Sequence, residues 1–126
     1  MHKHKKLQQA FLVGVLLVFA FAFVGCDTLV RDSYRTLSVS SATYEASMRS
    51  AADLFKQDRI TLEQKEKILE IANQYWAAFH AATDLLEAYV IVESADGEQR
   101  LIVAMAEFMK VFGRFMDYVQ PLIGGK

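Results

Sequence analysis

The stretch TLEQKEKILEIANQYWAAFHAATDLLEAYVIVE, residues 61–93, decides the fold, because its apolar residues recur at helical spacing on two faces. A helix that packs against one neighbour needs a single apolar stripe, so two stripes predict neighbours on two sides. The stretch therefore predicts one member of a three-helix bundle. One stripe comprises Leu62, Leu69, Ala72, Trp76, Phe79, Thr83, Leu86 and Val90, and the other comprises Ile68, Ile71, Tyr75, Ala78, Ala82, Leu85, Tyr89 and Val92.

The residues at the start of this stretch predict where the helix begins. Thr61 and Gln64 have the spacing of a capping box, in which each side chain accepts a hydrogen bond from the other residue's backbone N–H. Glu63 lies in the first turn, where the helix dipole favours a negative charge. Asp58-Arg59-Ile60 interrupts the apolar periodicity just before Thr61. A helix over about 61–93 is therefore expected.

The residues before this stretch predict a helix over about 29–57. A strand over Thr36–Ser41 is the competing interpretation, because the many Ser and Thr residues from Thr36 to Ser50 lower helix propensity. The helix is favoured because one apolar seam persists for three heptads. The seam consists of Tyr34, Leu37, Ser41, Tyr44, Met48, Ala51 and Phe55, and the opposite face of Arg35, Ser38, Ser47, Arg49, Ser50 and Asp53.

The residues after it predict a third helix over about 98–120. Asp96 is the expected N-cap, with Gln99 at the third position, and Pro121 and Gly124-Gly125 are expected to stop the helix. Its apolar face covers about half of the circumference, which is more than a single groove needs. The main stripe is Leu101, Met105, Phe108, Phe112, Phe115 and Val119, widened by Ile102, Met109 and Met116.

Together these segments predict an all-α fold. The connections are short, so successive helices run antiparallel and form an up-down-up bundle over about 29–57, 61–93 and 98–120. Such a bundle has one core and corresponds to a single domain of residues 26–126.

The N-terminal segment has a different character. Met1–Lys6 is basic, Ala10–Val24 is a nearly unbroken apolar run, and the run ends at Phe23-Val24-Gly25-Cys26 with the chain's only cysteine. This layout resembles the export signal of bacterial lipoprotein precursors. The resemblance implies that Cys26 receives a diacylglyceryl group, that residues 1–25 form a signal helix which is cleaved off, and that the new N-terminus is acylated. Phe23 stands where that family more often has Leu.

An uncleaved membrane anchor is the alternative for this segment. Ala10–Gly25 would reach ~24 Å as a helix, whereas a bilayer core is about 30 Å thick. A lone cysteine followed at once by polar sequence favours the lipoprotein. Asp27 resembles the sorting signal that keeps lipoproteins of enteric bacteria at the inner membrane. The expected location is therefore the periplasmic face of the inner membrane, in preference to the outer membrane.

The net charge of the chain limits which classes of partner it can bind. The chain has 14 Lys and Arg residues against 15 Asp and Glu. Lys3, Lys5 and Lys6 lie in the signal, so residues 26–126 keep 11 basic side chains against 15 acidic ones, a net charge of −4. Nucleic-acid binding needs a basic face, so no nucleic-acid partner is expected.

No pattern in the sequence indicates catalysis. His80 and Asp84 are spaced i, i+4 with Glu87 nearby, but a di-iron bundle needs paired Glu-x-x-His motifs, and position 77 is Ala. A solvated polar face with a weak His–Asp pair is the preferred interpretation. No hydrolase, phosphate-loop or dinucleotide fingerprint occurs. We therefore expect a non-enzyme without metal or other cofactor.

The expected function is a lipid-anchored binding or scaffold module of the cell envelope. The mature part is only diffusely similar to small uncharacterised helical lipoproteins of Gram-negative bacteria. One alternative is a membrane-active protein of the phage or plasmid type, and another is a small-ligand carrier with a cavity of roughly 300 Å³ or more in the bundle core. A protein partner or a second copy is expected on the third helix, at Met105, Phe108, Met109, Phe112 and Met116.

Overall fold

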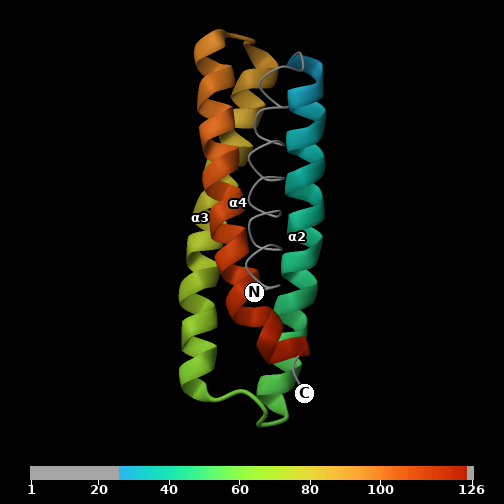
Figure 1. Ribbon diagram of the computed structural model, residues 1–126, viewed down its shortest axis with the longest axis vertical. Coiled ribbons are helices and arrows are strands. Elements are labelled where there is room, and N and C mark those ends of the chain that lie inside the picture. The colour runs from blue at the N-terminus through green and yellow to red at the C-terminus, as the bar shows by residue number, and fades with distance from the viewer. Residues whose placement is uncertain (1–25, 125–126) are drawn as a thin grey trace, which may run out of the picture.

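The computed structural model describes residues 26–124, and these form three α-helices and no strand. Helix α2 runs over Cys26–Lys56, α3 over Leu62–Ile91 and α4 over Ala95–Gly124 (Figure 1). The predicted all-helical fold is confirmed, and Thr36–Ser41 is helical. The signal helix expected over residues 1–25 lies outside the described residues.

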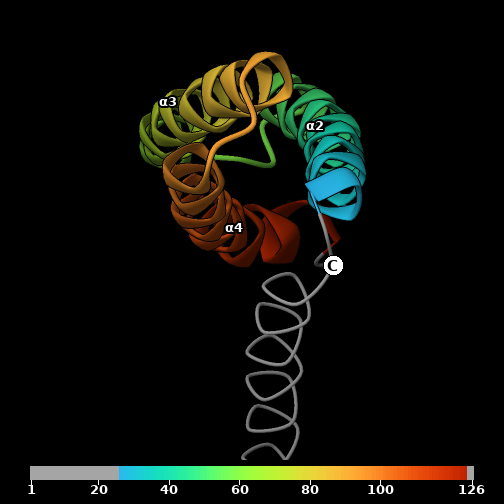
Figure 2. The ribbon, with the colours of Figure 1, turned by 90° about the horizontal axis from the view of Figure 1, so that it is seen from above.

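The helices run up, down and up around a common axis (Figures 1 and 2). The first turn of α2 lies at the same end as the connection between α3 and α4; we call this the Cys26 end. The connection between α2 and α3 lies at the opposite end, which we call the Asp58 end. Within the bundle, α3 packs most extensively on α4, and α2 makes fewer contacts with either.

Helix α2 ends in a Schellman motif. The backbone N–H of Arg59 donates to the carbonyl of Leu54 at 2.9 Å, and that of Asp58 donates to the carbonyl of Phe55 at 3.1 Å. Asp58 has a φ of 58°, in the left-handed region that this motif requires. The motif turns the chain sharply, and Ile60 is buried just after it.

The capping box at the start of α3 is confirmed. The backbone N–H of Gln64 donates to the Thr61 hydroxyl at 3.1 Å, and the backbone N–H of Thr61 donates to Gln64 Oε1 at 2.9 Å. These two bonds satisfy donors that the first turn of a helix would otherwise leave unpaired.

The predicted start of α4 was wrong by two residues. The cap is Ser94 and not Asp96, because the Ser94 hydroxyl accepts from the Gly97 N–H at 2.9 Å and its carbonyl accepts from the Glu98 N–H at 2.9 Å. Asp96 lies inside the first turn and pairs with Arg100 at 3.0 Å. A serine two residues upstream can cap the same turn, and this leaves the aspartate free for an i,i+4 pair.

The predicted stop at Pro121 was also wrong. Helix α4 continues through Pro121 to Gly124, and its last turns lead toward α2 (Figure 1). Proline removes one backbone donor and crowds the preceding turn, but so close to the helix end few intrahelical bonds remain to be lost.

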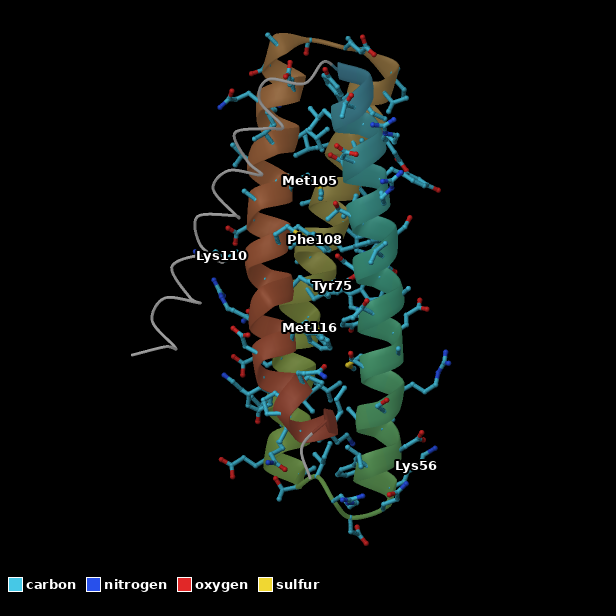
Figure 3. All side chains as sticks on the ribbon, turned by 45° about the vertical axis from the view of Figure 1, so that its right-hand side comes forward. Lys56, Tyr75, Met105, Phe108, Lys110 and Met116 are labelled. Atoms are coloured by element: carbon cyan, nitrogen blue, oxygen red, sulfur yellow. The ribbon has the colours of Figure 1, made fainter. Side chains whose placement is uncertain are left out.

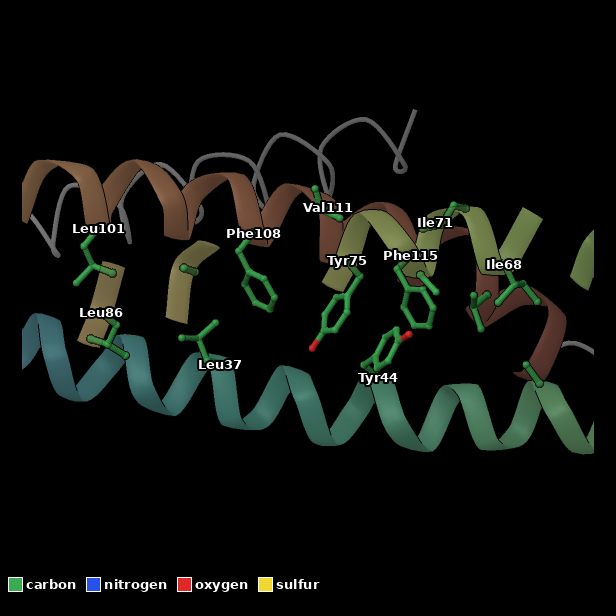
Figure 4. Packing of buried hydrophobic residues seen from close by; sticks show 14 of the residues in the cluster. Leu37, Tyr44, Ile68, Ile71, Tyr75, Leu86, Leu101, Phe108, Val111 and Phe115 are labelled. Carbon is green, nitrogen blue, oxygen red and sulfur yellow. The ribbon is translucent and has the colours of Figure 1, made fainter. Parts of the chain in front are cut away.

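Aromatic rings fill the middle of the core (Figure 4). The rings of Tyr44 and Tyr75 stack with centroids 4.0 Å apart and an interplanar angle of 6°. Phe108 and Phe115 of α4 are fully buried, with centroids 5.5 Å and 6.2 Å from that of Tyr75. One contact cluster therefore joins all three helices at this level.

The buried face of α2 differs from the predicted seam. Leu37, Tyr44 and Ala51 are buried as predicted, but Tyr34 is 68% exposed. Ser47 was assigned to the polar face and is buried; its hydroxyl lies 4.0 Å from Met116 Sδ of α4. Serines at intervals of seven residues return to the same helical face, where a small side chain fits between closely packed helices. The buried serines are Ser33, Ser40 and Ser47.

Candidate binding groove

An open groove of about 940 Å³ runs between α2 and α3. Only these two helices line it, so it lies outside the packed contacts with α4. Val30 and Ile91 line it near the Cys26 end, and Glu45 and Phe79 line it near the middle of the bundle. The α2 wall, from Val30 to Glu45, corresponds to ~22 Å of helix at about 1.5 Å per residue. The groove is therefore elongated along α2.

The walls of the groove are mainly apolar. Tyr34, Leu37, Phe79, Leu86 and Val90 line it. Tyr34 and Val90 are strongly exposed, although both belong to the apolar stripes of their helices. One of the two predicted stripes of α3 is thus only partly covered, and its outer residues face solvent. Leu62, Leu69, Trp76 and Val90 of that stripe are exposed.

Few polar groups line the groove, and they are of two kinds: isolated hydroxyls and charged side chains. The Thr83 hydroxyl is buried and has no hydrogen-bond partner among the described residues. Ser38 and Ser41 add two hydroxyls on the α2 side. Arg31, Glu45 and Glu87 supply the charged groups among the lining residues. A ligand in the groove would meet an apolar surface with isolated hydroxyl groups and a mixed set of charges.

Tyr75 is fully buried in the core and is not among the lining residues of the groove. Its hydroxyl is buried and has no partner of good hydrogen-bonding geometry among the described residues. Burial raises the pKa of Tyr75 to about 12, and the nearby Ser41 hydroxyl offsets part of that rise. Burial also raises the pKa of Tyr44, and the Trp76 side chain offsets part of that rise. Both phenols are therefore neutral at physiological pH and act as packing groups.

The His80 ring lies against an aromatic neighbour on α3. The His80 ring stacks on the Trp76 indole, with centroids 5.6 Å apart and an interplanar angle of 27°. Among residues 26–124, no three His, Cys, Asp or Glu side chains come close enough to hold a metal ion. Asp84 and Glu87 are both exposed on α3.

The five residues expected to bind a partner through α4 differ in exposure. Figure 3 labels three of them, Met105, Phe108 and Met116. Phe108 is fully buried, and Met105, Phe112 and Met116 are half-buried against the core. Met109 alone of the five is exposed. Most of this surface is therefore used within the bundle, and binding through α4 stays a prediction that depends chiefly on Met109.

The expected lipid site lies at the edge of the described residues. Cys26 and Asp27 form the start of α2, four and three residues before Val30. Residues 1–25, which carry the predicted signal, lie outside the described part of the chain. None of the helices between residues 26 and 124 has the length and apolarity that a bilayer crossing needs.

Comparisons with protein-family models, with curated proteins and with solved structures give no match. The groove must therefore be interpreted from its own residues.

Sequence reasoning missed the groove, although the sequence contained a signal for it. The narrow α2 seam cannot cover both stripes of α3, and one α3 stripe therefore had to be left partly open. The helix periodicity gives no information on which stripe that is, because both have similar hydrophobicity.

Proposed function

We propose that this chain is the precursor of a lipid-anchored, non-catalytic binding module of the bacterial cell envelope. In this proposal residues 1–25 are an export signal, and residues 26–126 are the mature domain. Acylated Cys26 holds the domain at the membrane, and Asp27 retains it on the periplasmic face of the inner membrane. The groove between α2 and α3 is the docking surface.

The anchor is supported by the sequence around Cys26. A basic start, an apolar run and a small residue before a lone cysteine are the parts of a lipoprotein signal. A diacylated or triacylated cysteine anchors firmly, because each buried methylene contributes about 0.8 kcal/mol and one chain alone is marginal. Acylation also accounts for a single cysteine that has no partner for a disulfide.

The groove is the single observation that supports binding, and its shape favours an amphipathic helix as the occupant. Its apolar walls extend along Val30–Glu45 of α2 and are open to solvent on one side. An occupant would bury one face and keep the other in water, which is how an amphipathic helix binds a groove. A wholly apolar ligand would leave part of its surface exposed. The charges of Arg31, Glu45 and Glu87 could pair with polar residues on that helix.

Photocrosslinking in a Gram-negative host tests both parts of the proposal. A photoreactive amino acid replaces Ser38, which lines the groove, or Val39, which is exposed and does not line it. We expect crosslinking from position 38 and not from position 39, to a protein segment with apolar residues at helical spacing. Intact-mass measurement of the same protein should show a chain that starts at acylated Cys26.

Each alternative gives a different product. A crosslink to lipid, or to a second copy of the chain, would replace the partner helix as the occupant. Equal crosslinking at both positions, or none at either, would remove the groove as a docking surface. A free Cys26 thiol, with residues 1–25 retained or with the product in the periplasmic fluid, would contradict the anchor.

A further inference from the structure

Three consecutive apolar side chains are exposed at the Cys26 end. Val90, Ile91 and Val92 are 54%, 81% and 66% exposed at the end of α3. Ile91 is the most exposed large apolar residue of the described chain. Scattered exposed apolar residues are ordinary on a protein surface, but three in succession at one tip form a small apolar patch. We call Val90-Ile91-Val92 the apolar tip.

The apolar tip lies at the end of the bundle where the sequence places a membrane. Cys26 begins α2 at that end (Figure 1), and the apolar run Ala10–Val24 directly precedes it in the chain. An acylated Cys26 would bring a bilayer to this end of the bundle. An uncleaved anchor over the apolar run would bring it to the same end.

The opposite end has a different surface. The Asp58 end carries Lys56, Asp58, Arg59 and Glu63 at or next to its turn, all of them exposed. Leu62 is the exposed large apolar residue there, at 60%, and it stands among polar neighbours. The two ends of the bundle are therefore chemically unlike, and a run of exposed apolar residues occurs at the end next to the anchor.

The charges near the apolar tip argue against electrostatic attraction to lipid. Glu87, Glu93, Asp96 and Glu98 lie close to the tip in sequence. Of the basic side chains nearby, Arg100 pairs with Asp96 at 3.0 Å, and Arg31, which lines the groove with Val90 and Ile91, lies 3.8 Å from Asp32. Anionic lipids attract basic segments and repel acidic ones. Contact with a bilayer at this end would therefore depend on apolar burial and would be insensitive to salt.

We propose that the apolar tip inserts into the interface of the bilayer to which the chain is anchored, so that the bundle stands on its Cys26 end. This inference deepens the proposed function, which supplies the membrane at that end. Its consequence is that the open groove begins at the membrane surface, since Val90 and Ile91 line its end. A partner helix would then enter the groove from a segment close to the bilayer.

Lipid-depth quenching tests the orientation. The full chain is produced in a Gram-negative host, purified from membranes and reconstituted into phosphatidylcholine vesicles that contain nitroxide-labelled lipid. A fluorophore is attached through Glu93→Cys, beside the apolar tip, or through Gln57→Cys at the Asp58 end, after the mass shows that Cys26 is acylated. We expect strong quenching at position 93 and none at position 57, unchanged by added salt.

Two variants make the result specific to the apolar tip. Ile91→Ser together with Val92→Ser should abolish quenching at position 93, whereas Leu62→Ser, which removes an exposed apolar side chain from the opposite end, should leave it unchanged. Helical circular dichroism of each variant confirms folding.

The outcomes separate this inference from the proposed function. Acylated Cys26 without quenching at position 93, or quenching that survives the double serine variant, would overturn the inference and leave the anchor intact. If the mass shows a free Cys26 thiol and retained residues 1–25, the lipid anchor is overturned; Cys26→Ser then leaves position 93 as the one labelled site, and quenching there would still support the inference.

Discussion

At the scale of single residues, Tyr75 combines complete burial with an unsatisfied hydroxyl. Its ring stacks on Tyr44 at 4.0 Å and lies 5.8 Å from Phe79 and 5.5 Å from Phe108, between centroids. Its hydroxyl, however, finds no well-aligned partner among the described residues. A buried polar group without a partner costs about 1–3 kcal/mol. The packing of the Tyr75 ring therefore stabilises the fold, whereas its unpaired hydroxyl lowers the free energy of unfolding.

Tyr75→Phe should consequently raise the free energy of unfolding by about 1 kcal/mol, because it removes the unpaired oxygen and keeps the ring. Urea denaturation followed by circular dichroism measures the change. Tyr44→Phe is the matched control, and it should give no such gain, because the Tyr44 hydroxyl is not among the buried side-chain oxygens that lack a hydrogen-bond partner. A loss of stability in Tyr75→Phe would show that the hydroxyl is satisfied in solution.

The same pair of variants should differ at alkaline pH. The pKa of Tyr75 rises from 10.0 to about 12 in the folded chain. The unfolded chain therefore loses this proton first, and stability falls as the pH increases from 10 toward 12. Below pH 10 both states hold the proton, and no dependence is expected from this group. The decline should be smaller in Tyr75→Phe, with a remainder from Tyr44, whose pKa is also raised.

At the scale of the elements, the C-terminus of α2 carries a strained residue. Asp58 occupies the left-handed position of the Schellman motif with a φ of 58°. Glycine adopts this conformation without the steric cost of a Cβ atom, which is roughly 1–2 kcal/mol for most residues and less for Asp. Asp58→Gly should therefore raise the free energy of unfolding by about 0.5 kcal/mol.

Thermal unfolding provides the measurement for this substitution. Asp58→Ala is the control, because alanine keeps the Cβ atom and loses the short polar side chain that tolerates this conformation. It should leave the protein no more stable than the unsubstituted chain. Equal effects of Gly and Ala would mean that the backbone conformation of Asp58 does not limit stability.

The helices also differ in which of their features could be predicted from the sequence. The start of α3 was predictable because Thr61 and Gln64 form a local motif whose geometry depends on four residues. The buried face of α2 was not, because counting apolar residues favours Tyr34 over Ser33. The burial of small serines depends on how closely α4 approaches, which is a property of the packed bundle. The groove was not predicted for the same reason, because it depends on how α2 packs against α3 in the folded bundle.

At the scale of the whole molecule, the three helices differ in how extensively they pack against one another. Helix α3 packs chiefly on α4, and α2 makes fewer contacts with either. Three of the buried α2 residues are serines, which contribute little apolar area. The Ser and Thr residues over 36–50 also lower the helix propensity of α2. Local stability follows buried apolar contact, so α2 should open more readily than the α3–α4 pair.

Native-state hydrogen exchange of the full chain in detergent micelles measures this difference. Amides of buried α2 residues such as Leu37 and Tyr44 should exchange through a partial opening with a lower free energy than those of Tyr75 and Phe108. Tyr75→Phe should then raise protection throughout, because it strengthens the core that all three helices share. Equal protection of the three helices would instead indicate that the bundle opens only as one unit. Partial opening would matter for the proposed function, because α2 carries both Cys26 and one wall of the groove, so its movement would change the groove's width at the Cys26 end.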